Sequence, residues 1–249
     1  MRVCVLSSGS KGNSSIIFND KTKILIDDGM QLPYIEDNLK DINISINDLD
    51  GILITHEHDD HIKGLKKLIS KYDPLLYVDS KLLEVLRKSL GDFRYEIYNE
   101  NFLIGDLKIN VIKLSHDSAT CNGFIIKDNR KELVYITDTG YINRKYIELT
   151  SNKNMYIIES NHDEEMLENG PYPYFLKQRV ISDRGHLSNM QTSKYLKKVI
   201  GSRTKNIIFI HLSEKNNTPE LVLETFNKYN DFNNVTISKQ NERTEVIEV

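Results

Sequence analysis

The chain has 249 residues, of which 39% are hydrophobic and 28% are charged, a balance typical of a folded globular protein and not of a disordered or collagen-like one. This length is compatible with one large domain, so we expect residues 1–249 to form a single domain. The 33 Lys and Arg residues against 36 Asp and Glu residues leave a net charge of -3. This charge argues against a wholly basic surface that coats nucleic acid, but it allows a local basic patch.

The cysteines and the hydropathy of the chain bear on its location: the cysteines indicate a reducing compartment, and the hydropathy indicates no membrane span. Cys4 and Cys121 lie far apart without a CxxC spacing, so neither a disulfide framework nor a thiolate zinc site is indicated. No segment reaches the roughly 18 apolar residues of a membrane span, and the apolar stretch near Met1 is too short for a signal peptide. We expect a cytoplasmic protein without membrane association, and no required protein partner is evident.

The opening third of the chain predicts three antiparallel strands and then helices. The runs VCVL, SSIIF and KILID are separated by turn-rich segments, which is typical of adjacent short strands. A helix is expected over residues 33–42, a buried strand over 51–55, and one helix over 60–72, where apolar residues recur at helical spacing.

The remaining two thirds alternate strands with helices. Further strands are expected over 75–78, 95–98, 107–114, 123–127, 132–137, 155–160, 206–212, 235–238 and 244–249, and helices over 80–90, over 173–200 with a break at 183–187, and after Pro219. Two β-rich blocks interleaved with helices favour two mixed sheets packed together and covered by helices. Residues 168–185, rich in Pro, Tyr and basic side chains, are expected to form a functional insertion.

The segment HEHDDH at residues 56–61 carries the strongest chemical signal. With only 7 His in the chain, three His and one Asp at fixed places arise by chance on the order of 10⁻⁴ to 10⁻³ times. The segment lies between the strand GILIT and the following helix, at the edge where α/β folds bind ligands. The alternative is that these residues only cap the helix, with Asp60 accepting its free N–H groups.

Single polar residues follow three later strands. His116 follows INVIKLS, Asp138 follows ELVYIT, and His211 follows NIIFI. One His at a strand end is usually a partly buried polar residue, but three such residues together with HEHDDH favour a metal site built from strand ends.

The order of these motifs resembles that of the metallo-β-lactamase-fold hydrolases, and it covers nearly the whole chain. The motifs in order are Asp27 in LIDDG, HEHDDH, His116 in LSHD, Asp138 in TDTG and His211 in FIHLS. SSGSKGNSS at 7–15, ESNHD at 159–163 and GHLSN at 185–189 are similar to the YycJ/WalJ-like branch of that family. The resemblance implies an α/β fold, a four-layer αββα sandwich of two mixed β-sheets flanked by helices, with a dinuclear site on one edge.

The resemblance also implies two divalent metal ions and a role for each motif. The first ion takes His56, His58 and His116, the second takes Asp60, His61 and His211, Asp138 bridges them, and Asp27 orients ligands without binding metal. Imidazole and carboxylate donors suit Zn²⁺, Mn²⁺ or Fe²⁺. A metal-bridging hydroxide is the expected nucleophile, with Asp60 orienting it. The alternative for Asp27 is a buried turn carboxylate unconnected with the metals, and Asp28 is the less favoured choice for its role.

His186 bears on which bond is broken. It lies in RGHLSN, where the family needs no metal ligand, and resembles the histidine that protonates the leaving oxygen in tRNA-processing endonucleases of this fold. An alkoxide leaving group needs a proton or a metal, whereas a thiolate does not, so such an acid favours phosphodiester cleavage. The alternative is that His186 merely lies near a helix start capped by Ser188.

We therefore expect a metal-dependent phosphodiesterase or nuclease that acts on DNA, and the branch resemblance suggests a 5′-to-3′ exonuclease. Two alternatives stay open: a thioester or lactone hydrolase of a small metabolite, and a non-catalytic metal-binding scaffold. The lactamase branch of the family typically has a cysteine in the second metal site. Cys121 follows no such motif, so lactam hydrolysis is disfavoured. The expected substrate contacts are Ser10, Asn13, His162 and Arg184. The insertion interleaves Tyr172, Tyr174 and Phe175 with Lys177, Arg179 and Arg184, which suits base stacking but is equally typical of a solvated surface helix.

Overall fold

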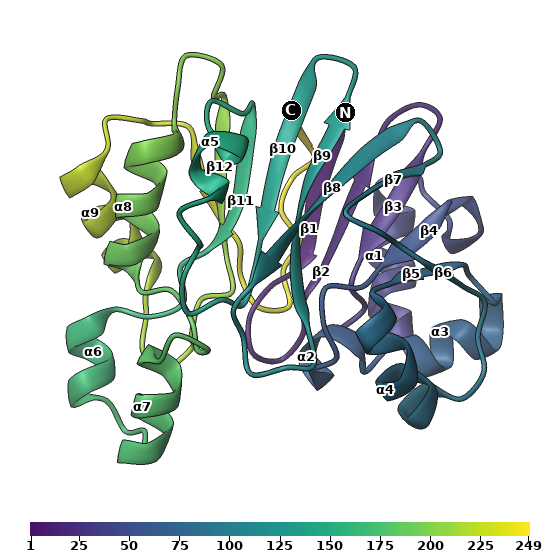
Figure 1. Cartoon of the computed structure of the whole chain (residues 1–249), viewed down its shortest axis with the longest axis horizontal. Helices are drawn as coiled ribbons and strands as arrows, with labels where there is room; N and C mark the ends of the chain where they lie inside the picture. The colour runs from purple at the N-terminus through teal and green to yellow at the C-terminus, as the bar shows by residue number, and fades with distance from the viewer.

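The structure, a computed structural model that describes all 249 residues, consists of two seven-stranded sheets packed face to face with helices on their outer faces (Figure 1). This arrangement confirms the predicted four-layer αββα sandwich.

The first sheet comes mainly from the first hundred residues. Its order is β14-β1-β2-β3-β4-β5-β6, antiparallel from β14 to β3 and parallel from β3 to β6. The strands are β1 (Arg2–Ser7), β2 (Ser14–Phe18), β3 (Lys23–Ile26), β4 (Gly51–Leu53), β5 (Leu76–Val78), β6 (Tyr95–Ile97) and β14 (Ile247–Glu248).

The second sheet repeats this plan in the rest of the chain. Its order is β13-β12-β11-β10-β9-β8-β7, antiparallel from β7 to β10 and parallel from β10 to β13. The strands are β7 (Asn101–Ile104), β8 (Leu107–Leu114), β9 (Cys121–Asp128), β10 (Lys131–Ile136), β11 (Met155–Glu159), β12 (Asn206–Ile210) and β13 (Val235–Ile237).

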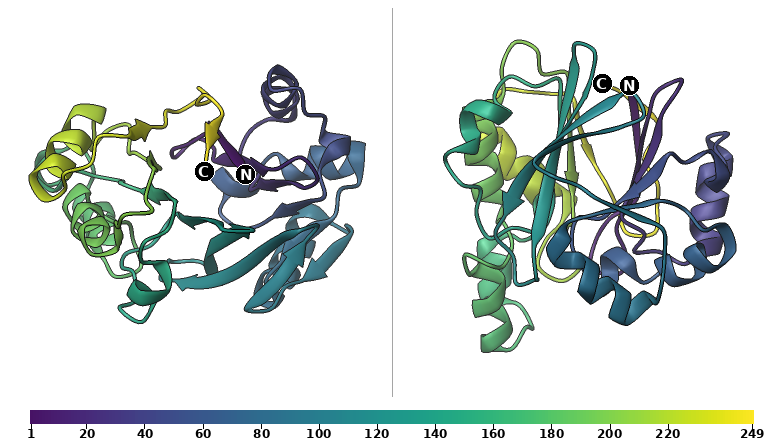
Figure 2. Two further views of the ribbon diagram at one scale, coloured as in Figure 1. Left: turned by 90° about the horizontal axis from the view of Figure 1, so that it is seen from above. Right: turned by 45° about the vertical axis from the view of Figure 1, so that its right-hand side comes forward.

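The helices cover both outer faces, as the view from above in Figure 2 makes visible. The helices that connect strands of the first sheet are α1 (Leu32–Asp41), η1 (Ile46–Asp48), α2 (Asp59–Ile62), α3 (Leu65–Tyr72) and α4 (Ser80–Leu90). Those that connect strands of the second sheet are α5 (Tyr146–Thr150), α6 (Glu164–Asn169), α7 (Tyr174–Ile181), α8 (Asn189–Val199) and α9 (Pro219–Tyr229). No helix is both long and apolar enough to cross a membrane.

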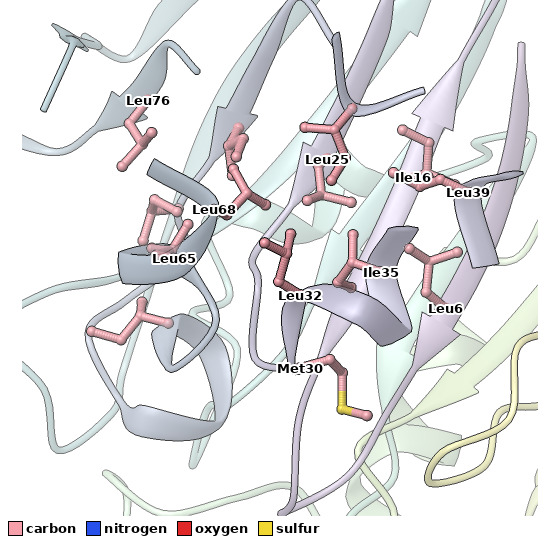
Figure 3. Packing of buried hydrophobic residues seen from close by; sticks show 14 of the residues in the cluster. Leu6, Ile16, Leu25, Met30, Leu32, Ile35, Leu39, Leu65, Leu68 and Leu76 are labelled. Carbon is pink, nitrogen blue, oxygen red and sulfur yellow. The ribbon is translucent and has the colours of Figure 1, made fainter. Parts of the chain in front are cut away.

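Three clusters of buried apolar residues fill the spaces between the layers. A cluster of 21 residues lies between the first sheet and its helices, where Leu25 packs with Ile35 and Leu68 (Figure 3). A cluster of 20 residues, including Ile26 and Phe124, lies between the two sheets, and one of 14 residues lies between the second sheet and α8 and α9. Successive side chains of each strand therefore pack alternately against the other sheet and against the covering helices. This packing on both faces fixes the positions of the strand ends.

The helix predicted over residues 60–72 is wrong in one respect, because the chain breaks at Gly64 into α2 and α3. A Cβ atom on Gly64 would lie 2.0 Å from the Met30 carbonyl oxygen and 2.5 Å from Oδ1 of Asp28. The backbone of this segment is pressed against the loop after β3, and this tertiary contact overrides the helical spacing.

Four short elements were not predicted from the sequence: η1, β7, α5 and α6. Each is six residues or shorter, so its periodicity is too brief to recognise. The three opening strands, by contrast, are antiparallel neighbours as predicted.

Candidate metal centre

The polar residues predicted from strand ends meet at one edge of the sandwich, at the lower edge in Figure 1. Asp27 follows β3, HEHDDH follows β4 and its last three residues begin α2, His116 follows β8, Asp138 follows β10, and His211 follows β12. Three of them have positive φ angles, 57° at Asp27, 36° at Asp138 and 57° at His211. Non-glycine residues in this region cost of order 1 kcal/mol each, and such strain concentrates at functional sites.

The first predicted ligand group, His56, His58 and His116, has its donor nitrogen atoms within 4.8 Å of one another. Nδ1 of His116 donates to the Gly185 carbonyl oxygen at 3.0 Å, so a neutral His116 presents the lone pair of Nε2, which lies 3.2 Å from Nδ1 of His58. Nε2 of His56 is buried and has no hydrogen-bond partner. Burial lowers the pKa of His56 well below its usual value and also lowers that of His116. Neutral imidazoles with converging lone pairs fit a divalent cation.

The second predicted group combines imidazoles with carboxylates. Donor atoms of Asp60, His61 and His211 lie within 4.8 Å of one another. Nε2 of His211 is 3.3 Å from Oδ2 of Asp60 and 3.3 Å from Oδ1 of Asp138. Burial alone would lower the pKa of His211, but Asp138 and Asp60 outweigh it and raise that pKa to about 9. The group therefore attracts positive charge, which is the electrostatic environment that a metal ion requires.

Asp138 lies between the two groups. Its Oδ2 is 3.1 Å from Nε2 of His61, and its Oδ1 is 3.9 Å from Nε2 of His116. Its carboxylate therefore reaches ring nitrogens from both predicted ligand sets, as a bridging ligand must.

Asp27 lies behind His61 and away from the open edge. Its Oδ2 lies 2.7 Å from Nδ1 of His61 and also accepts a hydrogen bond from the Thr55 hydroxyl, while its Oδ1 accepts from the Thr55 backbone N–H. Asp27 is fully buried. When Nδ1 of His61 donates to Asp27, the lone pair of Nε2 faces Asp60 and Asp138, with the Asn13 side-chain amide 3.1 Å away. Asp28, in contrast, has two carboxylate oxygens without any hydrogen-bond partner.

Asn13 lies behind Asp60, although it is one of the predicted substrate contacts. Its side-chain amide donates to Oδ2 of Asp60 at 3.0 Å, and its backbone N–H donates to the Asp60 carbonyl at 2.7 Å. Asn13 is only 3% exposed. This location favours a role in positioning Asp60, which sequence reasoning missed because the two residues are 47 positions apart.

His186 lies beside the metal groups and is oriented by a residue that the sequence did not single out. Its Nδ1 lies 3.0 Å from Oε2 of the fully buried Glu159, and its ring stacks on that of His211 with centroids 5.2 Å apart. Oε1 of Glu159 accepts the backbone N–H groups of Thr139 and Leu187. Glu159 ends β11 within the motif ESNHD, so the strand-end rule that found Asp138 also applies to it.

Glu159, His186, Asp138 and His211 form a further group of donor atoms within 4.8 Å of one another. Both oxygens of Glu159 already have hydrogen-bond partners from this chain. Glu159 is therefore better suited to orienting His186 than to binding a metal.

The metal groups open into a cleft of about 190 Å³. Ser10, His186, His211 and residues of α7 line it, and Arg179 of α7 forms an ion pair with Asp117. Arg184 lies close by, with its Nε 3.3 Å from the His116 carbonyl oxygen. His162 does not line this cleft: it is 2% exposed and lines another cavity, on the opposite face of α7.

A sequence model of the β-lactamase superfamily domain matches residues 22–212. The matched range contains Asp27, the segment 56–61, His116, Asp138 and His211. All the strand ends of the candidate metal centre therefore fall within the matched domain.

Two relatives are similar over most of the chain. Exodeoxyribonuclease YycJ of Bacillus anthracis is 37% identical over 87% of this chain and 84% of its own length, and exodeoxyribonuclease WalJ of Streptococcus pneumoniae is 38% identical over 87% and 83%. Among solved structures, the metallo-β-lactamase fold protein YhfI of Bacillus subtilis covers 98% of both chains with a TM-score of 0.75 at 17% identity, a likeness of fold alone.

Proposed function

This chain belongs to the β-lactamase superfamily, in the branch of the YycJ and WalJ exodeoxyribonucleases, and we propose that it hydrolyses phosphodiester bonds of DNA as a 5′-to-3′ exonuclease. The chain is a metal-dependent hydrolase that is similar to exodeoxyribonucleases over most of its length. The pairing of His186 with buried Glu159, beside seven convergent His and Asp side chains, is the observation that carries the proposal.

The donor set fits divalent metal ions, and we propose two of them, Zn²⁺ or else Mn²⁺ or Fe²⁺. His56, His58 and His116 would hold one, Asp60, His61 and His211 the other, and Asp138 both. When bound, such a pair supplies Lewis-acid stabilisation and an activated water. The unpartnered Nε2 of His56 is the clearest sign of fit, because a buried ring nitrogen without a partner is costly unless a cation occupies its lone pair.

His186 is placed to hold a proton at the cleft. Glu159 accepts a hydrogen bond from Nδ1, which fixes the ring and leaves Nε2 as the atom that can donate to a leaving oxygen. The ring is partly exposed, with 18% of its side-chain surface accessible, so a substrate oxygen can approach it. A departing sugar alkoxide needs this proton, whereas a thiolate does not. The arrangement therefore favours phosphodiesters over thioesters.

Charge at the cleft suits a phosphate. Two divalent ions would bring the formal net charge of -3 to about +1, with the added charge concentrated at the cleft. Arg184 adds a cation at the same edge. Ser10 is exposed on the cleft wall, where its hydroxyl can contact a phosphate oxygen.

The proposal is tested by comparing His186→Ala with the wild type on two substrates. On 5′- and 3′-labelled DNA oligonucleotides we expect kcat to fall roughly 10²–10⁴-fold, because the alkoxide loses its proton donor. On bis(p-nitrophenyl) phosphate, whose leaving group needs no proton, we expect a much smaller loss. Metal content measured on both proteins should be equal, which separates loss of the acid from loss of the centre.

Each part of the proposal has a result that would contradict it. Equal losses on both substrates would remove the acid role of His186. Hydrolysis of thioesters or lactones that exceeds DNA hydrolysis and survives His186→Ala would favour a metabolite hydrolase. A purified protein that retains no metal on dialysis would favour a scaffold. Release of mononucleotides from the 3′ end would reverse the proposed polarity, and RNA assayed in parallel tests the choice of DNA.

A further inference from the structure

The first turn of α7 carries the two most exposed large apolar side chains of the chain. Tyr174 is 76% exposed and Phe175 is 73% exposed, and no other large apolar residue exceeds 58%. Figure 1 shows α6 and α7 projecting beyond the edge of the sandwich that holds the metal centre. Single exposed apolar residues are ordinary, but two adjacent aromatic rings on a projecting helix beside a site call for an occupant.

The other end of α7 is fixed against the metal centre. A Cβ atom on Gly185, the residue before His186, would lie 2.1 Å from the Val180 carbonyl oxygen. A Cβ atom on Gly140, two residues after Asp138, would lie 2.3 Å from the Ser182 carbonyl oxygen. Because these loops touch the last turn of α7 so closely, the position of the helix relative to the metal ligands is fixed.

One side of α7 leads from the cleft to Phe175, whereas Tyr174 lines the cavity on the opposite face of the helix. Arg179 lines the metal cleft, and its Nε pairs with Asp117, the residue after His116. Phe175 precedes Arg179 by four residues, so both lie on neighbouring turns of one helix face, about 6 Å apart along the axis. This rise is close to the spacing of successive nucleotides in an extended strand. A strand leaving the metal centre along α7 meets a cation first and an aromatic ring next.

We propose that Phe175 is a stacking platform for unpaired bases of a nucleic-acid strand whose scissile phosphate lies at the metal centre. The inference rests on the proposed nuclease function and adds the substrate class, a single-stranded segment. Only unpaired bases expose their faces to a side chain, and each base stacked on an aromatic ring stabilises binding irrespective of its sequence.

The charges near the platform agree with this occupant. Arg179 and Arg184 place cations where the phosphates would run, while Lys177 is turned away and donates to the Glu168 carbonyl. A second copy of the chain fits less well. Two aromatic side chains bury roughly 300–500 Å² together, well below the roughly 800 Å² per partner of a stable dimer.

The chain has no tryptophan, so Phe175→Trp introduces a single fluorescent reporter at the platform. With the metal-loaded protein and a phosphorothioate oligothymidylate that resists hydrolysis, we expect saturable quenching of its emission. The same sequence in a duplex should quench far less. Leu103→Trp, at a 58% exposed site on β7, is the matched control and should not respond.

Steady-state kinetics provide the second readout. We expect Phe175→Ala to raise KM for single-stranded DNA roughly tenfold, with kcat little changed, and Phe175→Trp to restore it. Hydrolysis of bis(p-nitrophenyl) phosphate should be unaffected, because Phe175 does not line the metal cleft and a substrate of this size does not extend along the helix to it. Leu103→Ala should match the wild type on both substrates.

Failure of the inference and failure of the proposed function give different results. If the wild type degrades DNA but Phe175→Trp is not quenched and Phe175→Ala keeps its KM, the platform is excluded and the nuclease stands. Equal quenching by duplex and single strand would overturn the preference for unpaired bases. If the wild type hydrolyses neither DNA nor the nitrophenyl ester, the nuclease function fails, and absence of quenching then also excludes the platform.

Discussion

The predicted ligands of the first sheet all lie in one six-residue segment after β4. Those of the second sheet, His116, Asp138 and His211, follow three separate strands. Both sheets follow the same plan of antiparallel strands continuing into parallel ones. The difference lies in what fixes the side chains. In the first sheet, hydrogen bonds among Asp27, Thr55 and His61 hold the segment locally.

In the second sheet the register of neighbouring strands determines where each ligand lies. Ile136 pairs with Ile158, and Glu159 pairs with Ile210, so Asp138 and His211 leave the sheet at nearly the same height. A substitution at the metal ligands of the first sheet should therefore affect metal affinity through a single contact, such as that of Asp27 with His61. A change in the second half should act through the packing of whole strands.

The largest expected effect on metal affinity in a test of this difference is that of Asp27→Asn. The substitution removes the carboxylate that orients His61, and we expect metal affinity to fall about 10–100-fold while the fold is retained. Metal-binding titrations against a competing chelator measure the change. Asp28→Asn is the matched control, because that carboxylate has no hydrogen-bond partner, and its affinity should stay near that of the wild type. Equal losses in both variants would contradict the local role of Asp27.

The largest expected effect on stability is at Gly64, where the first half depends on close packing and not on an unusual backbone conformation. Its φ of -79° is open to any residue, but the Cβ of Gly64→Ala would meet the Met30 carbonyl oxygen. We expect a loss of about 3 kcal/mol in the free energy of unfolding, typical of an overpacked site. Urea denaturation measures it, with exposed Lys66→Ala as the control. An unchanged free energy of unfolding would show that α2 and α3 can move apart without loss of stability.

The smallest effect is an acid-dependent loss of stability from His162, which follows β11 in the second half. Burial lowers the pKa of His162 from 6.5 to about 4. The unfolded chain therefore binds a proton that the folded protein does not, and stability falls as the pH drops below 6.5. We expect the wild type to lose about 2 kcal/mol more than His162→Gln by pH 5, because the other buried histidines titrate in both proteins. Urea denaturation at pH 5 and pH 7.5, with metal chelated in both proteins, measures the difference, and parallel pH profiles would exclude the prediction.

The sequence was sufficient for the elements and residues that depend on local patterns. Helix 80–90 is present with those bounds, and strands 14–18 and 107–114 are as well, because each has a strong period and clear turn residues at its ends. The family and the sandwich fold followed from the order of the strand-end motifs. The single domain over residues 1–249 and the roles of the individual site residues stay predictions.

The tertiary structure decided what depends on residues distant in the chain. It brought Glu159 to His186 across 27 positions and Asn13 to Asp60 across 47, and it separated His162 from the cleft by α7. It also broke the helix at Gly64 and located Phe175 one turn from Arg179 at the metal edge. Local periodicity indicates which face of an element is buried. Which elements meet, and how closely, is set by the packing of the whole sandwich.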